Sequence, residues 1–147
     1  MKQLIASVYG PFQGGRVAFG LFLLRVIVGA AFAMHGYDKI TNPFHWGDQM
    51  GLPPILQGLA ALAEFGGGVA LIFGFLTPLA AAGIAVTMAV AFLTVHLKYG
   101  NPWIASKPGA NSYESVAFYF ITAVTVFLTG PGKISIDALL FDRKNNS

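Results

Sequence analysis

Four long apolar runs alternate along the chain with segments rich in polar residues, glycine and proline. A helix rises about 1.5 Å per residue, so roughly 20 apolar residues cross the ~30 Å hydrocarbon layer of a membrane. Three of the runs are about that long, and the fourth is slightly shorter. The pattern predicts an all-α membrane protein, a four-transmembrane-helix antiparallel bundle with helices at about 17–37, 55–76, 79–97 and 113–129.

The segments outside these runs predict how the helices are connected. The connection at Thr77-Pro78 is very short, and proline suits the first position of a helix, so the second and third helices should form a hairpin. Met1–Arg16 lacks the features of a signal peptide and is predicted to stay attached at the membrane interface. After the Gly130-Pro131-Gly132 stop, Ile134–Phe141 is predicted to form a short interfacial helix.

Composition supports a membrane protein with a single domain. Charged residues make up 10% of the chain, where about 25% is typical of soluble domains, and the mean hydropathy is strongly positive. Such a chain has too few polar side chains to cover a water-exposed surface. Its length fits one domain, spanning residues 1–147, in contact with the lipid bilayer.

The basic residues predict an orientation in the membrane. An even number of spans places both termini on one side, and the positive-inside rule assigns the side with more Lys and Arg to the cytoplasm. The terminal side carries five such residues and the opposite side three, so both termini are predicted to be cytoplasmic. These residues are Lys2, Arg16, Lys133, Arg143 and Lys144 against Lys39, Lys98 and Lys107.

The chain has no cysteine, which excludes thiolate catalysis, Cys-ligated zinc and Cys-ligated iron–sulfur clusters as its own chemistry. The net charge of +3 comes from scattered residues without a Lys/Arg cluster, so nucleic acid is not a predicted partner.

Two charged residues interrupt the apolar runs at similar predicted depths. Arg25 lies about 12 Å from one membrane face and Glu64 about 14 Å from the other, at 1.5 Å per residue. A charge inside a spanning helix usually faces the bundle interior and finds a partner. We therefore expect an Arg25–Glu64 ion pair, which could either serve a binding site or fix the register of the two helices.

Other polar residues gather at the predicted outer ends of the helices. His35 and Lys39 end the first helix, His96 ends the third, and Glu114 begins the fourth. They predict an outward-facing polar pocket, although hydrogen bonds at helix ends would explain His96 and Glu114 equally well. His35 and His96 could also be axial haem ligands, but the nearby positive charges disfavour haem, and no metal site is predicted.

The order of these motifs resembles the DoxX family of small membrane proteins over about Phe19–Leu140. Each motif is weak alone, but their shared order is specific. They are Leu24-Arg25, Gly29, His35-Gly36 and Lys39; Pro53, Glu64-Phe65-Gly66-Gly67, Gly74 and Thr77; Thr94-Val95-His96 and Tyr113-Glu114; and Gly130-Pro131-Gly132, Ser135 and Asp137.

The resemblance implies a four-helix bundle in a bacterial or archaeal cytoplasmic membrane and a role in quinone-linked, sulfur or oxidative-stress redox metabolism. One family member is the membrane subunit of a thiosulfate:quinone oxidoreductase. A quinone cofactor and partner subunits at the membrane are therefore implied. In this reading Arg25 and Lys39 bind substrate or quinone, and the catalytic residues are His35, Glu64, His96 and Glu114.

Two other function classes fit the sequence. A non-catalytic accessory subunit of a larger respiratory or photosynthetic complex would also be small, rich in glycine and alanine, and without a soluble catalytic domain. A small-molecule transporter or scaffold is a third class, but no inverted repeat supports it.

Overall fold

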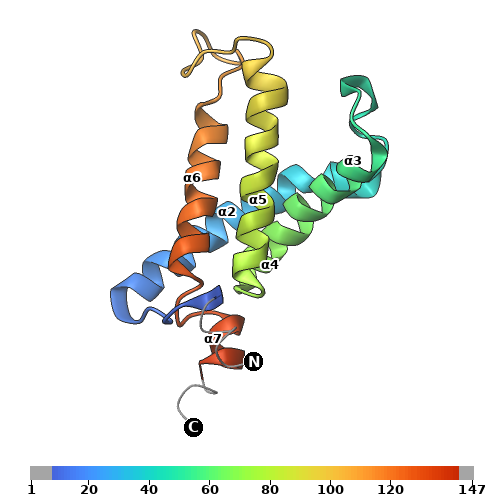
Figure 1. The fold of residues 1–147 in the computed structure, drawn as a ribbon. Helices are drawn as coiled ribbons and strands as arrows, with labels where there is room; N and C mark the ends of the chain where they lie inside the picture. The colour runs from blue at the N-terminus through green and yellow to red at the C-terminus, as the bar shows by residue number, and fades with distance from the viewer. Residues whose placement is uncertain (1–7, 143–147) are drawn as a thin grey trace.

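A computed structural model describes residues 8–142, which are helical throughout their regular structure and contain no strand (Figure 1). Two stretches of α-helix continue through a wider π-helical turn, so that Pro54–Phe73 and Thr77–Leu97 are each one continuous helix. The elements are α2 (Gly15–Thr41), the 3₁₀ turn η1 (Asp48–Met50), α3 (Pro54–Ala61), the π turn η2 (Leu62–Gly66), α4 (Gly67–Phe73), α5 (Thr77–Ala91), the π turn η3 (Phe92–Leu97), α6 (Glu114–Thr129) and α7 (Ile136–Phe141).

Three helices are long and apolar enough to cross a membrane: Gly15–Thr41, Pro54–Phe73 and Thr77–Leu97. The fourth apolar run forms α6, whose 16 residues are fewer than a perpendicular span needs. The protein is therefore an all-helical integral membrane protein with three candidate spans and one shorter apolar helix.

The second predicted run continues to residue 76, but α4 ends at Phe73. Gly74 adopts a left-handed conformation, with φ +64°, and the Phe75 N–H returns to the Ala70 carbonyl at 2.9 Å. This is a glycine-based helix stop of the Schellman type. The chain then turns within Gly74–Leu76 and begins α5 at Thr77, with Pro78 in its first turn as expected.

Glycines bring α2 into backbone contact with the second helix. A Cβ on Gly29 would lie 2.6 Å from the Gly68 carbonyl oxygen, and one on Gly36 would overlap the backbone at Phe65. These contacts set the antiparallel register, with Gly29 opposite Gly68 and Gly36 opposite Phe65. Close approach through small residues is the usual way for helices to associate in membranes.

The helices pack as two antiparallel pairs that meet at α4 and α5. α2 lies along α4 and η2, α5 lies along α6, and α4 also contacts α5 (Figure 1). The core between them contains Phe32, Leu71, Ile84 and Val126. We call the end with the loops 42–53 and 98–113 the loop side, and the end with the Gly74–Leu76 turn and α7 the terminal side.

The segment after Gly130 forms the predicted short helix, α7, on the terminal side. The Tyr9 ring packs on Phe141 with centroids 5.0 Å apart, so the start of the described chain contacts this helix. The rest of the predicted N-terminal interfacial segment, residues 1–7, and the basic residues Lys2, Arg143 and Lys144 lie outside the described residues.

Candidate functional site

The predicted Arg25–Glu64 ion pair is wrong. Arg25 is 1% exposed, and its Nη1 donates to the Leu71 carbonyl at 2.9 Å while its Nη2 donates to the Ile134 carbonyl. The register explains the change, because a residue four before Gly29 faces a position about four after Gly68. Long helical side chains also point toward the helix N-terminus, which carries the guanidinium toward the open carbonyls at the end of α4.

Asp137 completes a charged cluster on the terminal side. Its carboxylate is 0% exposed and accepts hydrogen bonds from the Leu76 and Thr77 N–H groups, both at 2.8 Å. These bonds cap the start of α5 from a distant part of the chain. The Asp137 charge also acts on Arg25, and the Tyr9 hydroxyl donates to Asp137 at 3.4 Å.

We call Tyr9, Arg25, Gly74 and Asp137 the Arg25 cluster. Burial, followed by the charge of Asp137 and the hydrogen bond to it, raises the pKa of Tyr9 to about 12. Gly74 fits beside the guanidinium because it has no side chain; a Cβ there would lie 2.9 Å from Arg25 Cζ and 2.6 Å from Ser135 Cβ. The cluster ties α2, the Gly74–Leu76 turn and α7 together.

Sequence reasoning missed the role of Asp137. In the sequence it stands only as the last member of the C-terminal motif. A usable signal was present, because α5 begins at Thr77-Pro78 without a capping side chain immediately before it. An acidic residue shortly after a glycine–proline stop was available to supply that cap.

Glu64 pairs instead with Lys39. The Lys39 Nζ lies 2.6 Å from one Glu64 carboxylate oxygen and 2.7 Å from the other. The Glu64 side chain is 3% exposed and that of Lys39 is 27% exposed. Lys39 Nζ also lies 4.5 Å from the centroid of the Trp46 ring, close enough for a cation–π contact.

The Lys39–Glu64 pair lines a cavity of about 690 Å³, which we call the first cavity. Glu64 reaches it from the π turn η2, a type of irregularity that often marks functional sites. The opposite wall is the loop-side half of the Thr77–Leu97 helix, including Val86 and Val90 of α5 and Thr94 of η3. Apart from the ion pair, the lining is almost entirely apolar, as in sites for organic ligands.

The loop 42–53 covers the first cavity with Trp46, Met50 and Leu52. Gln57, which is 0% exposed, holds this loop in place. Its side chain accepts from the Gly47 N–H at 2.7 Å and donates to the Leu52 carbonyl at 2.8 Å and to Asp48 at 2.9 Å. The polar interruption at Gln57 was visible in the sequence, but the loop that it organises was not.

The other predicted site residues lie elsewhere on the loop side. His35 is exposed, with its ring centroid 6.4 Å from that of Tyr119. His96, in η3, has its Nδ1 3.1 Å from the Asn101 side-chain nitrogen, and Glu114 begins α6. Within residues 8–142, none of these three lines the first cavity, and no three His, Asp or Glu side chains gather as a metal ion would require.

The geometry supports binding chemistry at one place. An ammonium group and a carboxylate, which together are almost neutral, stand in the wall of an otherwise apolar cavity that opens between the helices of a membrane protein. The ammonium can donate to a ligand oxygen, and the carboxylate can accept or return a proton. The fold and site thus define a small helical membrane protein with a cavity suited to a largely apolar organic ligand.

Comparison with known proteins agrees with this class. Residues 20–97 match the family model DoxX, more than half of the chain, so the protein belongs to the DoxX family. It is 33% identical over 126 residues to "Inner membrane protein YqjF" of Escherichia coli (strain K12), covering 82% of this chain and 92% of the relative. It is 30% identical over 130 residues to "Putative oxidoreductase CatD" of Bacillus subtilis (strain 168), covering 86% and 91%. No solved structure matches the chain.

Proposed function

We propose that this protein is a membrane subunit in quinone-linked redox metabolism and that it binds the quinone head group beside Lys39 and Glu64. The observation that carries the proposal is the ion pair between half-buried Lys39 and buried Glu64 in the wall of the apolar first cavity. A quinone needs this combination, because its ring is apolar and its two carbonyl oxygens accept hydrogen bonds. The oxidoreductase in the printed name of the Bacillus subtilis relative adds support.

Each residue at the site has a chemical role in the proposal. Lys39 donates to one quinone carbonyl and gives that oxygen one proton on reduction. The Glu64 carboxylate takes up the second proton from the loop side and passes it to the ring, and Lys39 is reprotonated from the same side. Trp46, on the covering loop, packs against the ring face. Reduction to quinol takes up two electrons and two protons; the electrons come from a partner protein with a redox centre of its own, since this chain has no cysteine to hold a cluster.

His35, His96 and Glu114 remain candidates for the proton path between the first cavity and the loop-side surface. Arg25 has no place in the proposed head-group site, because both of its Nη atoms donate to backbone carbonyls on the terminal side. The proposal therefore assigns binding to Lys39 alone.

The proposal also places four spans in a cytoplasmic membrane, with α6 completing the bundle and both termini in the cytoplasm. The absence of native cysteine makes this testable by single-cysteine labelling in intact cells. Lys107→Cys should react with an impermeant maleimide from outside, and Lys133→Cys only after the membrane is opened. The reverse pattern would contradict the orientation.

Quinone binding can be measured with the protein's own fluorescence. The chain has two tryptophans, so Trp103→Phe leaves Trp46 as the single reporter, 4.5 Å from Lys39 Nζ. In lipid nanodiscs, a quinone with one isoprene unit should quench Trp46 in a saturable way. Loss of a charge-assisted hydrogen bond is worth about 1.5–3 kcal/mol, so Lys39→Met should weaken binding roughly 10- to 100-fold.

Lys98→Met is the matched control, because Lys98 is exposed and outside the first cavity. It should bind like the parent. Equal affinity in Lys39→Met and Lys98→Met would contradict the head-group site. If the parent binds no quinone but is extracted in a stoichiometric complex with larger subunits, the accessory-subunit function would replace the proposal.

A further inference from the structure

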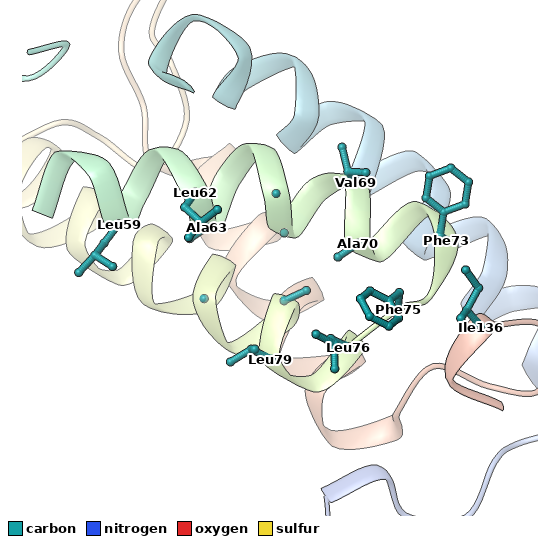
Figure 2. Close-up of a pocket in the computed structure, with 14 residues that line it drawn as sticks. Leu59, Leu62, Ala63, Val69, Ala70, Phe73, Phe75, Leu76, Leu79 and Ile136 are labelled. Atoms are coloured by element: carbon teal, nitrogen blue, oxygen red, sulfur yellow. The ribbon is translucent and has the colours of Figure 1, made fainter. Parts of the chain in front are cut away.

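A second apolar cavity adjoins the first on its terminal side. It has a volume of about 640 Å³ and lies between α4 and the first turns of α5. Figure 2 shows side chains of the two helices facing one another across it, with Phe75 and Leu76 of the connecting turn and Ile136 of α7 at its terminal end. Its lining is almost entirely apolar, so it offers no partner to a polar head group.

The two cavities meet at a narrow point between the helices. Three residues line both of them: Leu59, Ala63 and Gly83. Two of the three have little or no side chain, and a Cβ on Gly83 would lie 3.4 Å from the Ala63 Cβ. The two helices are in close contact here, and because both residues are small, the groove stays unobstructed on its open side, where larger side chains would fill it.

Together the cavities form one groove along α5. Their lining on this helix extends from Leu79 to Val95, a distance of about 24 Å at 1.5 Å per residue. That is roughly four fifths of the ~30 Å hydrocarbon thickness of a membrane. Glu64 directly follows Ala63, so the Lys39–Glu64 pair lies beside the point where the cavities meet, and the terminal end of the groove, at Phe75 and Ile136, is wholly apolar.

We infer that this groove holds the isoprenoid tail of the quinone, which passes Ala63 and Gly83 from the first cavity into the second. This inference rests on the proposed function and extends it, because it makes tail length part of recognition. A charged pair beside a long apolar groove matches a molecule with one polar head and one long apolar chain.

The absence of net charge on the Lys39–Glu64 pair favours a quinone over a phospholipid as the ligand. Lys39 and Glu64 neutralise one another, so the first cavity presents no net positive charge to a phosphate. The next buried cation, Arg25, is committed to backbone carbonyls outside both cavities. A neutral head group with carbonyl acceptors therefore suits the Lys39–Glu64 pair better than an anionic head group does.

The test compares quinones with one and with several isoprene units, using Trp46 fluorescence in the Trp103→Phe background. The longer tail buries more apolar surface, so the parent should bind it at least about tenfold more tightly. Gly83→Leu should remove that gain by filling the point where the cavities meet. Because Gly83 also lines the first cavity, the gain is measured as the ratio of the two affinities within the same variant. Gly20→Leu is the matched control, because Gly20 is exposed and has open space around it, and it should keep the gain.

Ala70→Phe is a second variant, in case Gly83→Leu does not fold. Ala70 lines the second cavity without lining the first, so filling it shortens the groove away from the head-group site (Figure 2). It too should remove the gain from the longer tail.

The outcomes separate the inference from the proposed function. If folded Gly83→Leu and Ala70→Phe still bind the longer-tailed quinone with the full gain in affinity, the inference about the tail is overturned. The proposed function would still stand in that case if Lys39→Met loses binding of the one-unit quinone. Failure of the parent to bind any quinone would overturn both. Native mass spectrometry that found a phospholipid adduct, lost in Gly83→Leu, would overturn the inference in favour of a membrane lipid.

Discussion

Arg25 and Lys39 are basic residues of the same helix, yet their surroundings differ in a way that separates structure from function. Arg25 is 1% exposed and donates to two backbone carbonyls, in a cluster that also contains Asp137. Lys39 is paired with Glu64 and lies against the Trp46 ring, its side chain is 27% exposed, and both Lys39 and Glu64 line the first cavity.

The comparison teaches that burial of a charge in a membrane helix does not by itself indicate a ligand site. The Arg25 cluster satisfies the backbone groups left open by a helix end and a turn, so removing it would expose them. Lys39 and Glu64 instead hydrogen-bond to one another and, within residues 8–142, to no open backbone group. The distinguishing feature of the pair is the cavity beside it, where a ligand can take up the remaining hydrogen bonds.

The largest effect should come from removing a charge in the Arg25 cluster. Asp137→Ala leaves the buried Leu76 and Thr77 N–H groups without their acceptor, and each buried donor left unpaired costs about 1–3 kcal/mol. The melting temperature in detergent should fall steeply. Asp142→Ala, a partly exposed acidic residue close to α7, is the control and should melt like the parent. Equal melting of both variants would show that the cluster is not structural.

A second, smaller loss of stability is expected for Gly74→Ala. Its φ of +64° disfavours alanine, and the new Cβ would also overlap the Arg25 guanidinium. Strain of about 1–2 kcal/mol and overpacking of about 1–3 kcal/mol should combine to roughly 2–5 kcal/mol. Gly51→Ala has a similar φ of +69° but open space around the Cβ, so chemical denaturation should show the strain alone. Identical losses would mean that Arg25 does not constrain Gly74.

The Lys39–Glu64 pair should respond in the opposite way, with a small change in stability and a large change in binding. Replacing both members, as in Lys39→Met with Glu64→Leu, removes the two charges together, so the free energy of unfolding should change by about 1 kcal/mol or less. Binding of the one-isoprene quinone should still fall at least about tenfold. A double variant that unfolds as readily as Asp137→Ala would show that the pair is structural and would break the comparison.

The smallest effect should be the alkaline titration of Tyr9. Its pKa is raised to about 12 in the folded protein, against about 10 in the unfolded chain, so its contribution to stability is complete below pH 10. That contribution is lost as the pH rises from about 10 through 12. The tyrosinate absorbance of the parent should therefore show one late-titrating group that Tyr9→Phe lacks. Loss of a different titration step would place the perturbed tyrosine outside the Arg25 cluster.

Much of the fold follows from local patterns in the chain. Apolar length predicts the helices, and the observed ones overlap all four predicted runs, although α6 is shorter than a span requires. Stop signals at Thr77-Pro78 and Gly130-Pro131-Gly132 predict the hairpin and the start of the C-terminal segment. The exact end of α4 was not predicted, because apolar residues continue past Gly74 and only its left-handed conformation ends the helix.

The candidate site was predicted in its residues but not in its pairing. Arg25, Lys39 and Glu64 were all identified. Their depths, however, were counted in residues from each membrane face, which ignores helix tilt and the length and direction of the side chains. A difference of a few residues in register then assigned the wrong cation to Glu64. His35, His96 and Glu114 share a side of the bundle with Lys39, as expected, but the first cavity does not extend to them.

The sequence by itself therefore determined that this is a helical membrane protein of the DoxX family and which of its polar residues lie within the apolar helices. Hydrophobic length and residue type settle these properties, and both are local. Only the tertiary structure decided that Glu64 pairs with Lys39, that Arg25 donates to backbone carbonyls near Asp137, and that a groove lies between the second helix and α5. These depend on which backbones approach at Gly29, Gly36 and Gly68, and such contacts join segments that are far apart in the chain.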